Sequence, residues 1–231
     1  MAELYNQDFF NETMGRGAIY EYFSYVLKLP VEQEFIGLSK KYVEVFSNLA
    51  SEYNNNDISY GVEVLKKYVE LEENADDKSA LLEELNIQWT SIFLTGASNV
   101  PCSSSVAITG MEMDAPWERV LEYYEIRRFK KPAGYTESDD HISMELLFMR
   151  EMNGLIIDMH NKGLDENIKD VLKEQYVFLN NYMYDWISSA CKNMAEFCKK
   201  TSYKYPLYLA VSHLLLGFLT YDKEYLAEIT A

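Results

Sequence analysis

The chain has 231 residues, of which 48% are hydrophobic and 14% aromatic, so it can bury a sizeable core. It carries 37 acidic residues against 21 Lys and Arg, which gives a formal net charge of −16. Nucleic acid and anionic membrane surfaces are bound through Lys and Arg, so this charge argues against both as partners. It permits a cationic partner such as a basic peptide, although many soluble proteins are acidic only for solubility.

Cysteine usage and hydropathy indicate a cytoplasmic protein. The three cysteines, Cys102, Cys191 and Cys198, are odd in number and are not spaced as zinc ligands, so we expect neither a disulfide framework nor a zinc site. The first eight residues are acidic and polar, unlike a secretory signal peptide. The longest nearly apolar run, residues 206–219, is too short to span a membrane. We therefore expect cytoplasmic localisation without stable membrane insertion.

Apolar residues recur at intervals of three and four almost throughout, which is the pattern of amphipathic helices. No segment alternates at period two for long enough to be a convincing strand. The sequence therefore predicts an all-α fold of about 9–11 helices in one globular domain over residues 1–231. The long helical segments are expected at residues 9–27, 31–53, 58–71, 80–94, 114–129, 137–160, 165–197 and 202–220.

A long central loop is predicted where the composition changes at residues 95–113, a Ser- and Gly-rich stretch bounded by Gly96 and Gly110. A loop of this length inside a compact chain is usually functional or disordered. It separates a first four-helix part from a second part, so it is a candidate hinge. The next helix starts at Asp114 and ends in the basic run 127–131, which we interpret as a solvated helix C-terminus.

Residues 135–149 combine a dense polar cluster with a long apolar run. Three acids and one histidine lie between Glu137 and His141. Thr136 or Ser138 can cap a helix that begins here, and the acids then lie near its first turn, where the helix dipole favours negative charge. On such a helix Glu137 and His141, four residues apart, can meet on one face. A well-capped helix start explains the pattern, while the density of ionisable groups beside the preceding loop favours a functional site.

The sequence contains no strong signature of catalysis. No histidine has a Glu three residues before it, as a di-iron bundle requires. Phosphate-binding and dinucleotide-binding glycine motifs are absent, as is the Gly-x-Ser-x-Gly nucleophile elbow. Glu137, Asp140 and His141 can in principle do acid–base chemistry, but nothing marks a nucleophile or a substrate pocket. We expect a protein that is not an enzyme and that has no cofactor and no bound metal.

The polar cluster also carries a family resemblance. Glu137-Ser138-Asp139-Asp140-His141 resembles the Glu-Pro-x-Asp-His motif of the TorD/DmsD/NarJ redox-enzyme maturation chaperones. Residues 89–96 are similar to the aromatic-x-x-Leu-Phe-x-Gly segment of that family, and Pro101 with the serines after it occupies the place of its Pro-rich loop. Two features depart from the family pattern. Ser138 replaces the Pro of the motif, and Gly96 is not followed by the Pro of the usual Gly-Pro pair.

This resemblance implies a cytoplasmic chaperone that binds the twin-arginine signal peptide or N-terminus of an apo molybdenum-cofactor oxidoreductase. The chaperone would hold this partner until cofactor insertion and folding precede export. We expect Glu137, Asp140 and His141 to form a polar edge that receives the arginines or backbone of the peptide, because guanidinium groups pair naturally with carboxylates. Aromatic residues would border the apolar part of the peptide. The full candidate set is Glu137, Asp139, Asp140, His141, Trp89, Phe93, Pro101, Trp117 and Tyr124.

Other interpretations remain open at this level. The partner can be a non-exported reductase subunit, for which the protein would serve as an assembly chaperone. A third interpretation is a metal- or nucleotide-dependent helical enzyme that uses the carboxylate–histidine cluster. The aromatic candidates have core packing as their simpler explanation. The chain is expected to be a monomer, or a dimer that exchanges helices through the 95–113 hinge.

Overall fold

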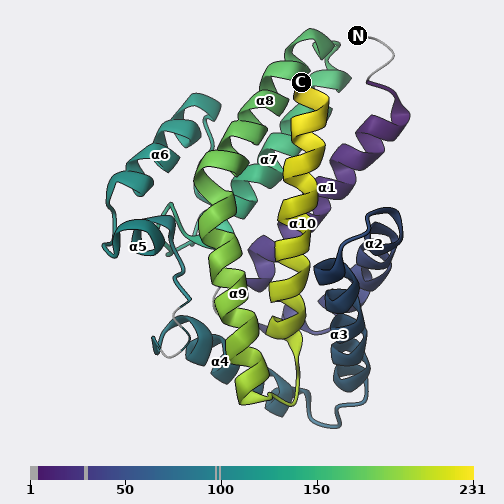
Figure 1. The fold of residues 1–231 in the computed structure, drawn as a ribbon, viewed down its shortest axis with the longest axis vertical. Helices are drawn as coiled ribbons and strands as arrows, with labels where there is room; N and C mark the ends of the chain where they lie inside the picture. The colour runs from purple at the N-terminus through teal and green to yellow at the C-terminus, as the bar shows by residue number, and fades with distance from the viewer. Residues whose placement is uncertain (1–4, 29–30, 97, 99) are drawn as a thin grey trace. The chain divides into compact units, whose positions relative to one another are not determined.

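A computed structural model of the chain describes residues 5–28, 31–96, 98 and 100–231. Within these residues the chain forms ten α-helices and no β-strand, so the all-α prediction is confirmed (Figure 1). None of these helices is long and apolar enough to cross a lipid bilayer. The helices are α1 Gln7–Val26, α2 Leu38–Glu52, α3 Asn56–Glu73, α4 Lys78–Phe93, α5 Ser104–Thr109, α6 Ala115–Arg127, α7 Ile142–Asn161, α8 Ile168–Phe178, α9 Tyr184–Thr201 and α10 Leu207–Thr230.

Some helix ends agree with the sequence signals and others do not. Asp114 caps α6 by accepting a hydrogen bond from the N–H of Ala115, as predicted. The segment predicted as a long loop contains the six-residue helix α5, whose first turn is capped from elsewhere in the chain. The long helix predicted at 165–197 is interrupted by a π-helical segment, Leu179–Met183. The last helix runs to Thr230, so its predicted end at residue 220 is wrong.

The described chain divides into two compact units, each built from separate stretches of sequence. The first unit comprises residues up to 27, residues 102–186 and residues from 222 onward. The second comprises residues 28–101 and 187–221. One boundary, between Pro101 and Cys102, falls inside the 95–113 segment, where residues 97 and 99 lie outside the described chain. The single domain and its hinge stay predictions.

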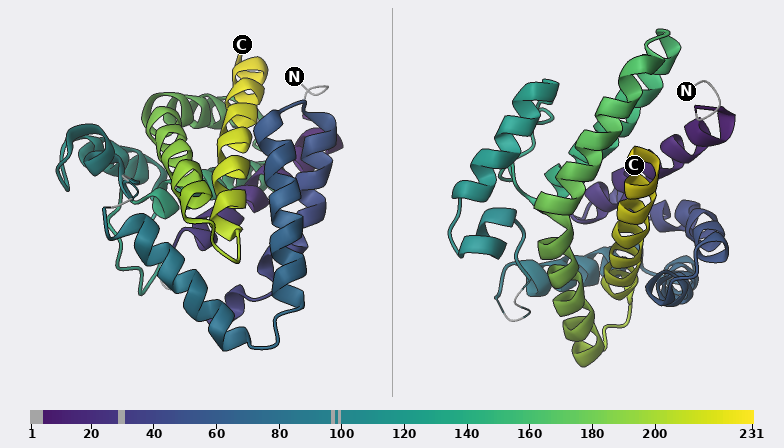
Figure 2. Two further views of the ribbon diagram at one scale, coloured as in Figure 1. Left: turned by 60° about the horizontal axis from the view of Figure 1, so that its bottom comes forward. Right: turned by 45° about the horizontal axis from the view of Figure 1, so that its top comes forward.

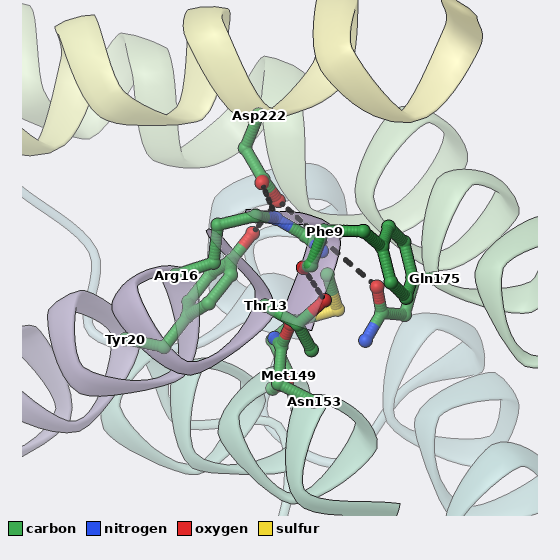
Figure 3. Close-up of polar contacts among 8 residues, drawn as sticks. All are labelled: Phe9, Thr13, Arg16, Tyr20, Met149, Asn153, Gln175 and Asp222. Atoms are coloured by element: carbon green, nitrogen blue, oxygen red, sulfur yellow. Dashed lines mark hydrogen bonds and ion pairs between the residues drawn. The ribbon is translucent and has the colours of Figure 1, made fainter. Parts of the chain in front are cut away.

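The first unit is organised by α1, which packs along α7 (Figures 1 and 2). A buried polar network joins α1 to α8 and to the end of α10 (Figure 3). The guanidinium of Arg16 forms an ion pair with Asp222 and donates to Gln175 Oε1 at 3.0 Å, and Tyr20 Oη donates to Asp222 Oδ2 at 2.6 Å. Burial alone lowers the pKa of Arg16, but Asp222 raises it above its usual value. The network holds the last turns of α10 in the first unit.

The second unit contains α2 and α3 side by side (Figure 2), together with α4 and the first part of α10. Two glycines let α3 and α10 approach closely. A Cβ on Gly61 of α3 would lie 2.7 Å from Leu214 Cγ, and a Cβ on Gly217 of α10 would lie 3.0 Å from the backbone nitrogen of Ile58. Both distances are shorter than van der Waals contact, so only glycine fits at this crossing without a shift.

Candidate functional site

Residues 137–141 form a turn instead of the first turn of a helix. Ser138 Oγ donates to Asp140 Oδ1 at 2.7 Å, and the N–H of His141 donates to the carbonyl of Ser138 at 3.1 Å. Helix α7 begins only at Ile142, and His141 caps it by accepting from the N–H of Ser143 through Nδ1. The predictions of a cap at Thr136 or Ser138, and of one helical face for Glu137 and His141, are therefore wrong. Side-chain bonds of this kind compete with helical ones, which explains the later start.

Asp140 is buried, with no exposed surface, and its carboxylate binds the first turn of α5. Oδ2 accepts a hydrogen bond from the N–H of Ser105 at 2.8 Å and lies 3.4 Å from Ser104 Oγ. The carbonyl of Asp140 accepts the N–H of Ser104 at 3.0 Å. Asp140 therefore caps α5 from a distant part of the chain and holds it against the start of α7.

His141 is also buried, with 4% of its surface exposed, and its Nδ1 lies 2.7 Å from Ser143 Oγ. Burial lowers the pKa of His141 from 6.5 to about 4, although the carboxylates of Glu137 and Asp140 act in the opposite direction. The imidazole is therefore neutral at pH 7. In this conformation His141 serves as a helix cap and offers no positive charge at the surface.

Glu137 and Asp139, in contrast, are half-buried and reach the surface of the turn. The side chain of Asp139 is 27% exposed. Its Oδ1 lies 3.2 Å from Lys131 Nζ, and its Oδ2 lies 3.4 Å from Trp117 Nε1. Lys131 Nζ also donates to the carbonyl of Glu137 at 2.6 Å. These two acids are the members of the polar cluster that a ligand can reach.

The aromatic candidates of the first unit meet at the same turn. Tyr124 is 4% exposed, and its hydroxyl donates to the carbonyl of Asp139 at 3.0 Å. Its ring packs against Phe129 and Phe148, with centroids 4.6 and 4.9 Å away. Burial is the main cause that raises the pKa of Tyr124 well above its usual value. Trp117 is half-buried. The structure thus brings Trp117, Tyr124 and Asp139 together, with Tyr124 as a support beneath the turn.

Trp89, Phe93 and Pro101 belong to the second unit. Trp89 is 1% exposed and Phe93 9% exposed, and their ring centroids lie 5.1 Å apart. Phe93 also contacts Tyr208 edge to face at 6.2 Å. This burial fits the core-packing explanation for both aromatic residues. Pro101 is half-buried.

Sequence reasoning missed Glu145, which lies one helical turn after His141 and has no exposed surface. Its Oε2 accepts a hydrogen bond from Trp186 Nε1 at 3.2 Å, and burial raises its pKa well above the usual value. A single acid within the apolar run 142–149 was the available signal. Asp140 is bound by Ser104 and Ser105. In the sequence, these two serines had no signal beyond their polarity. No group of three metal-binding side chains gathers anywhere in the described chain.

The helical fold and this turn can be compared with known families. The sequence profile described as nitrate reductase delta subunit matches residues 51–192, which is more than half of the chain. The chain belongs to the nitrate reductase delta subunit family. Members of this family are chaperones for molybdoenzyme maturation and not enzymes. The family suspected from the 137–141 motif is thereby confirmed. All nine candidate residues lie inside the matched region. No curated protein and no solved structure matches the chain.

Proposed function

We propose that the protein is a cytoplasmic chaperone that binds the twin-arginine signal peptide or N-terminal segment of an apo molybdenum-cofactor oxidoreductase and holds it until the cofactor is inserted. The observation that carries this proposal is the turn at 137–141 in a chain of this family. Buried Asp140 holds the turn, while Glu137 and Asp139 remain at the surface.

The exposed and the buried residues of the polar cluster are proposed to have different roles. Glu137 and Asp139 are proposed to pair with the arginines of the peptide, since carboxylates bind guanidinium through strong, charge-assisted hydrogen bonds. Asp139 already holds Lys131 at 3.2 Å, so an incoming arginine would replace one cation with another that can bind in a bidentate manner. Asp140 and His141 are positioning residues, because Asp140 has no exposed surface and His141 is almost fully buried. The net charge of −16 would attract a basic leader before contact.

Calorimetric titration with a twin-arginine peptide tests this proposal. We expect Glu137→Gln with Asp139→Asn to weaken binding at least about tenfold, since each loses a charge-assisted hydrogen bond. The control is Glu122→Gln with Glu125→Gln, two exposed acids on α6, which should leave affinity within about twofold. Equal affinity for both double variants, with unchanged circular dichroism, would remove these acids from the site.

A second candidate is an assembly chaperone for a reductase subunit that is not exported. The description of the matched family as a subunit of nitrate reductase favours this possibility. The two candidate functions differ in whether the arginines of the bound peptide are needed for binding. Replacing both arginines of the peptide by lysine should weaken binding if the export signal is recognised. Unchanged affinity would favour a partner recognised through another feature of its N-terminus.

A further inference from the structure

The first unit carries an open groove of about 740 Å³ between the end of α6 and the outer face of α7. Its floor is apolar. Phe148 and Met152 are almost fully buried beneath it, and Leu147 and Leu155 are half-exposed along it. The sides are charged, so the groove has the form of an apolar channel with a polar rim. Neither the candidate acids Glu137 and Asp139 nor the other candidate residues of the turn line it.

One end of this groove is basic in a chain that is otherwise strongly acidic. Arg127, Arg128 and Lys130 line that end. Arg127 pairs with Glu174 at 2.5 Å, but Arg128 and Lys130 are exposed and form no ion pair with any described residue. The helix dipole explains basic residues only in the last turn of α6, which ends at Arg127. Lys130 lies beyond that turn, so a solvated helix end does not account for the whole cluster.

Gly154 on α7 lines the same groove. A glycine inside an exposed helix costs about 1 kcal/mol relative to alanine, so it calls for a reason. Packing within the protein does not require a glycine at this position, since a Cβ at Gly154 would meet no heavy atom within 4 Å. Gly217 is the opposite case, where the neighbouring helix fills that space. Bare backbone in the wall of a groove allows close approach of a second chain.

We propose that this groove binds a segment of a partner polypeptide that carries acidic residues at one end and apolar residues at helical spacing along one face. The acidic end would contact Arg128 and Lys130. Phe129 packs on Phe148 at 5.5 Å, which places the basic end beside the start of the groove on α7. From Phe148 to Asp158, α7 rises about 15 Å, which suits two to three turns of a docked helix. This chemistry is opposite in charge to a twin-arginine leader, so the site does not depend on the proposed function.

A polypeptide fits the groove better than an anionic membrane does. The apolar floor is recessed below its rim, and the rim includes Glu21 and Glu151, both paired with Arg150 at 3.4 and 2.6 Å. A flat anionic bilayer would meet these carboxylates as like charges and could not reach the buried Phe148. A helix with one apolar stripe can enter the channel and leave the rim pairs intact.

The test uses fluorescence anisotropy with three labelled 12-residue peptides. The first has Glu in its first turn and Leu at positions spaced three and four apart, the second replaces Glu by Lys, and the third is a scramble of the first. We expect the first peptide to bind the full-length protein at least about tenfold more tightly than the other two. Arg128→Glu with Lys130→Glu should abolish this preference.

Gly154→Leu provides the variant that does not depend on charge. It should raise the helix propensity of α7 without lowering the melting temperature of the protein. It should nevertheless weaken binding of the acidic peptide at least about tenfold, because the new side chain fills the groove. Gly15→Leu is the matched control, because Gly15 is also helical with nothing within 4 Å of a Cβ, and it does not line the groove. Unchanged binding by Gly154→Leu would overturn the proposal. Equal binding of the scramble, displacement by tripolyphosphate, or tighter binding to phosphatidylserine vesicles would also overturn it.

Discussion

Arg16 and Asp222 lie 206 residues apart in the sequence and form an ion pair in which neither side chain has exposed surface. Arg16 Nη2 also donates to Asp222 Oδ2 at 3.2 Å, so the guanidinium binds both carboxylate oxygens. Buried charges are tolerated only when they are paired and hydrogen-bonded. This pair therefore ties the end of α10 to α1, and its loss should lower the stability of the first unit.

Arg16→Met should lower the free energy of unfolding by about 3–5 kcal/mol, because Asp222 would stay buried without its cation. The double variant Arg16→Met with Asp222→Leu should lose less than Arg16→Met alone, since it leaves no unpaired charge. Urea unfolding measures both. Lys40→Met is the control, because the Lys40–Glu73 pair is exposed. A cost for Arg16→Met no larger than that of the control would contradict this account.

Asp140→Ala should free α5 from the start of α7 without unfolding α7. Loss of the cap should cost about 1–2 kcal/mol and should speed amide hydrogen exchange at Ser105, whose N–H donates to Asp140. Exchange in the middle of α7 should remain slow. Hydrogen-exchange mass spectrometry of residues 102–109 makes the measurement. Protection of Ser105 equal to that in the unaltered protein would show that Asp140 does not hold this helix.

His141 should make stability depend on pH. Its folded-state pKa is about 4 against 6.5 when exposed, so the unfolded state binds a proton more readily. The contribution of His141 to stability is therefore fully present above about pH 6.5. It is lost as the pH drops towards 4, which lowers the free energy of unfolding by about 3 kcal/mol in total. His141→Asn keeps a capping oxygen and should flatten this slope, whereas His160→Asn at an exposed histidine should keep it. Equal slopes in the two variants would refute the assignment.

Glu145 should affect the pH dependence of stability in the direction opposite to His141. Burial raises its folded-state pKa, so the folded state binds the proton more tightly and loses stability as the pH rises above the ordinary carboxyl value of 4.5. Glu145→Gln keeps the acceptor for Trp186 and cannot ionise. It should therefore raise the melting temperature at pH 8 more than at pH 4.5. An identical change at both pH values would show that Glu145 does not titrate in this range.

The glycine crossing of the second unit predicts opposite effects for two similar changes. Gly217→Ala would push a methyl group against Ile58 and should cost about 1–3 kcal/mol. Gly15→Ala meets open space on α1 and should add up to about 1 kcal/mol through helix propensity. Thermal unfolding compares the two variants. Stabilisation by Gly217→Ala would mean that α3 and α10 are not in close contact.

The sequence predicted most helices because apolar periodicity and turn residues are local signals. Asp114 marked the start of α6 correctly. The start of α7 was placed too early, because Ser138 and Asp140 bond to each other in a turn, and nothing local distinguishes that turn from a helix cap. The end of α10 was missed because its last turns are held by Arg16, far away in the sequence.

The amino-acid sequence by itself determined the all-α class and the family, since both rest on short motifs and on spacing along the chain. Only the tertiary structure decided which members of the acidic cluster a ligand can reach. Asp140 is buried where its carboxylate accepts a hydrogen bond from the N–H of Ser105, 35 residues earlier in the chain, while Asp139 beside it stays partly exposed. Burial depends on which distant segments pack together, and the order of residues in one segment does not contain that information.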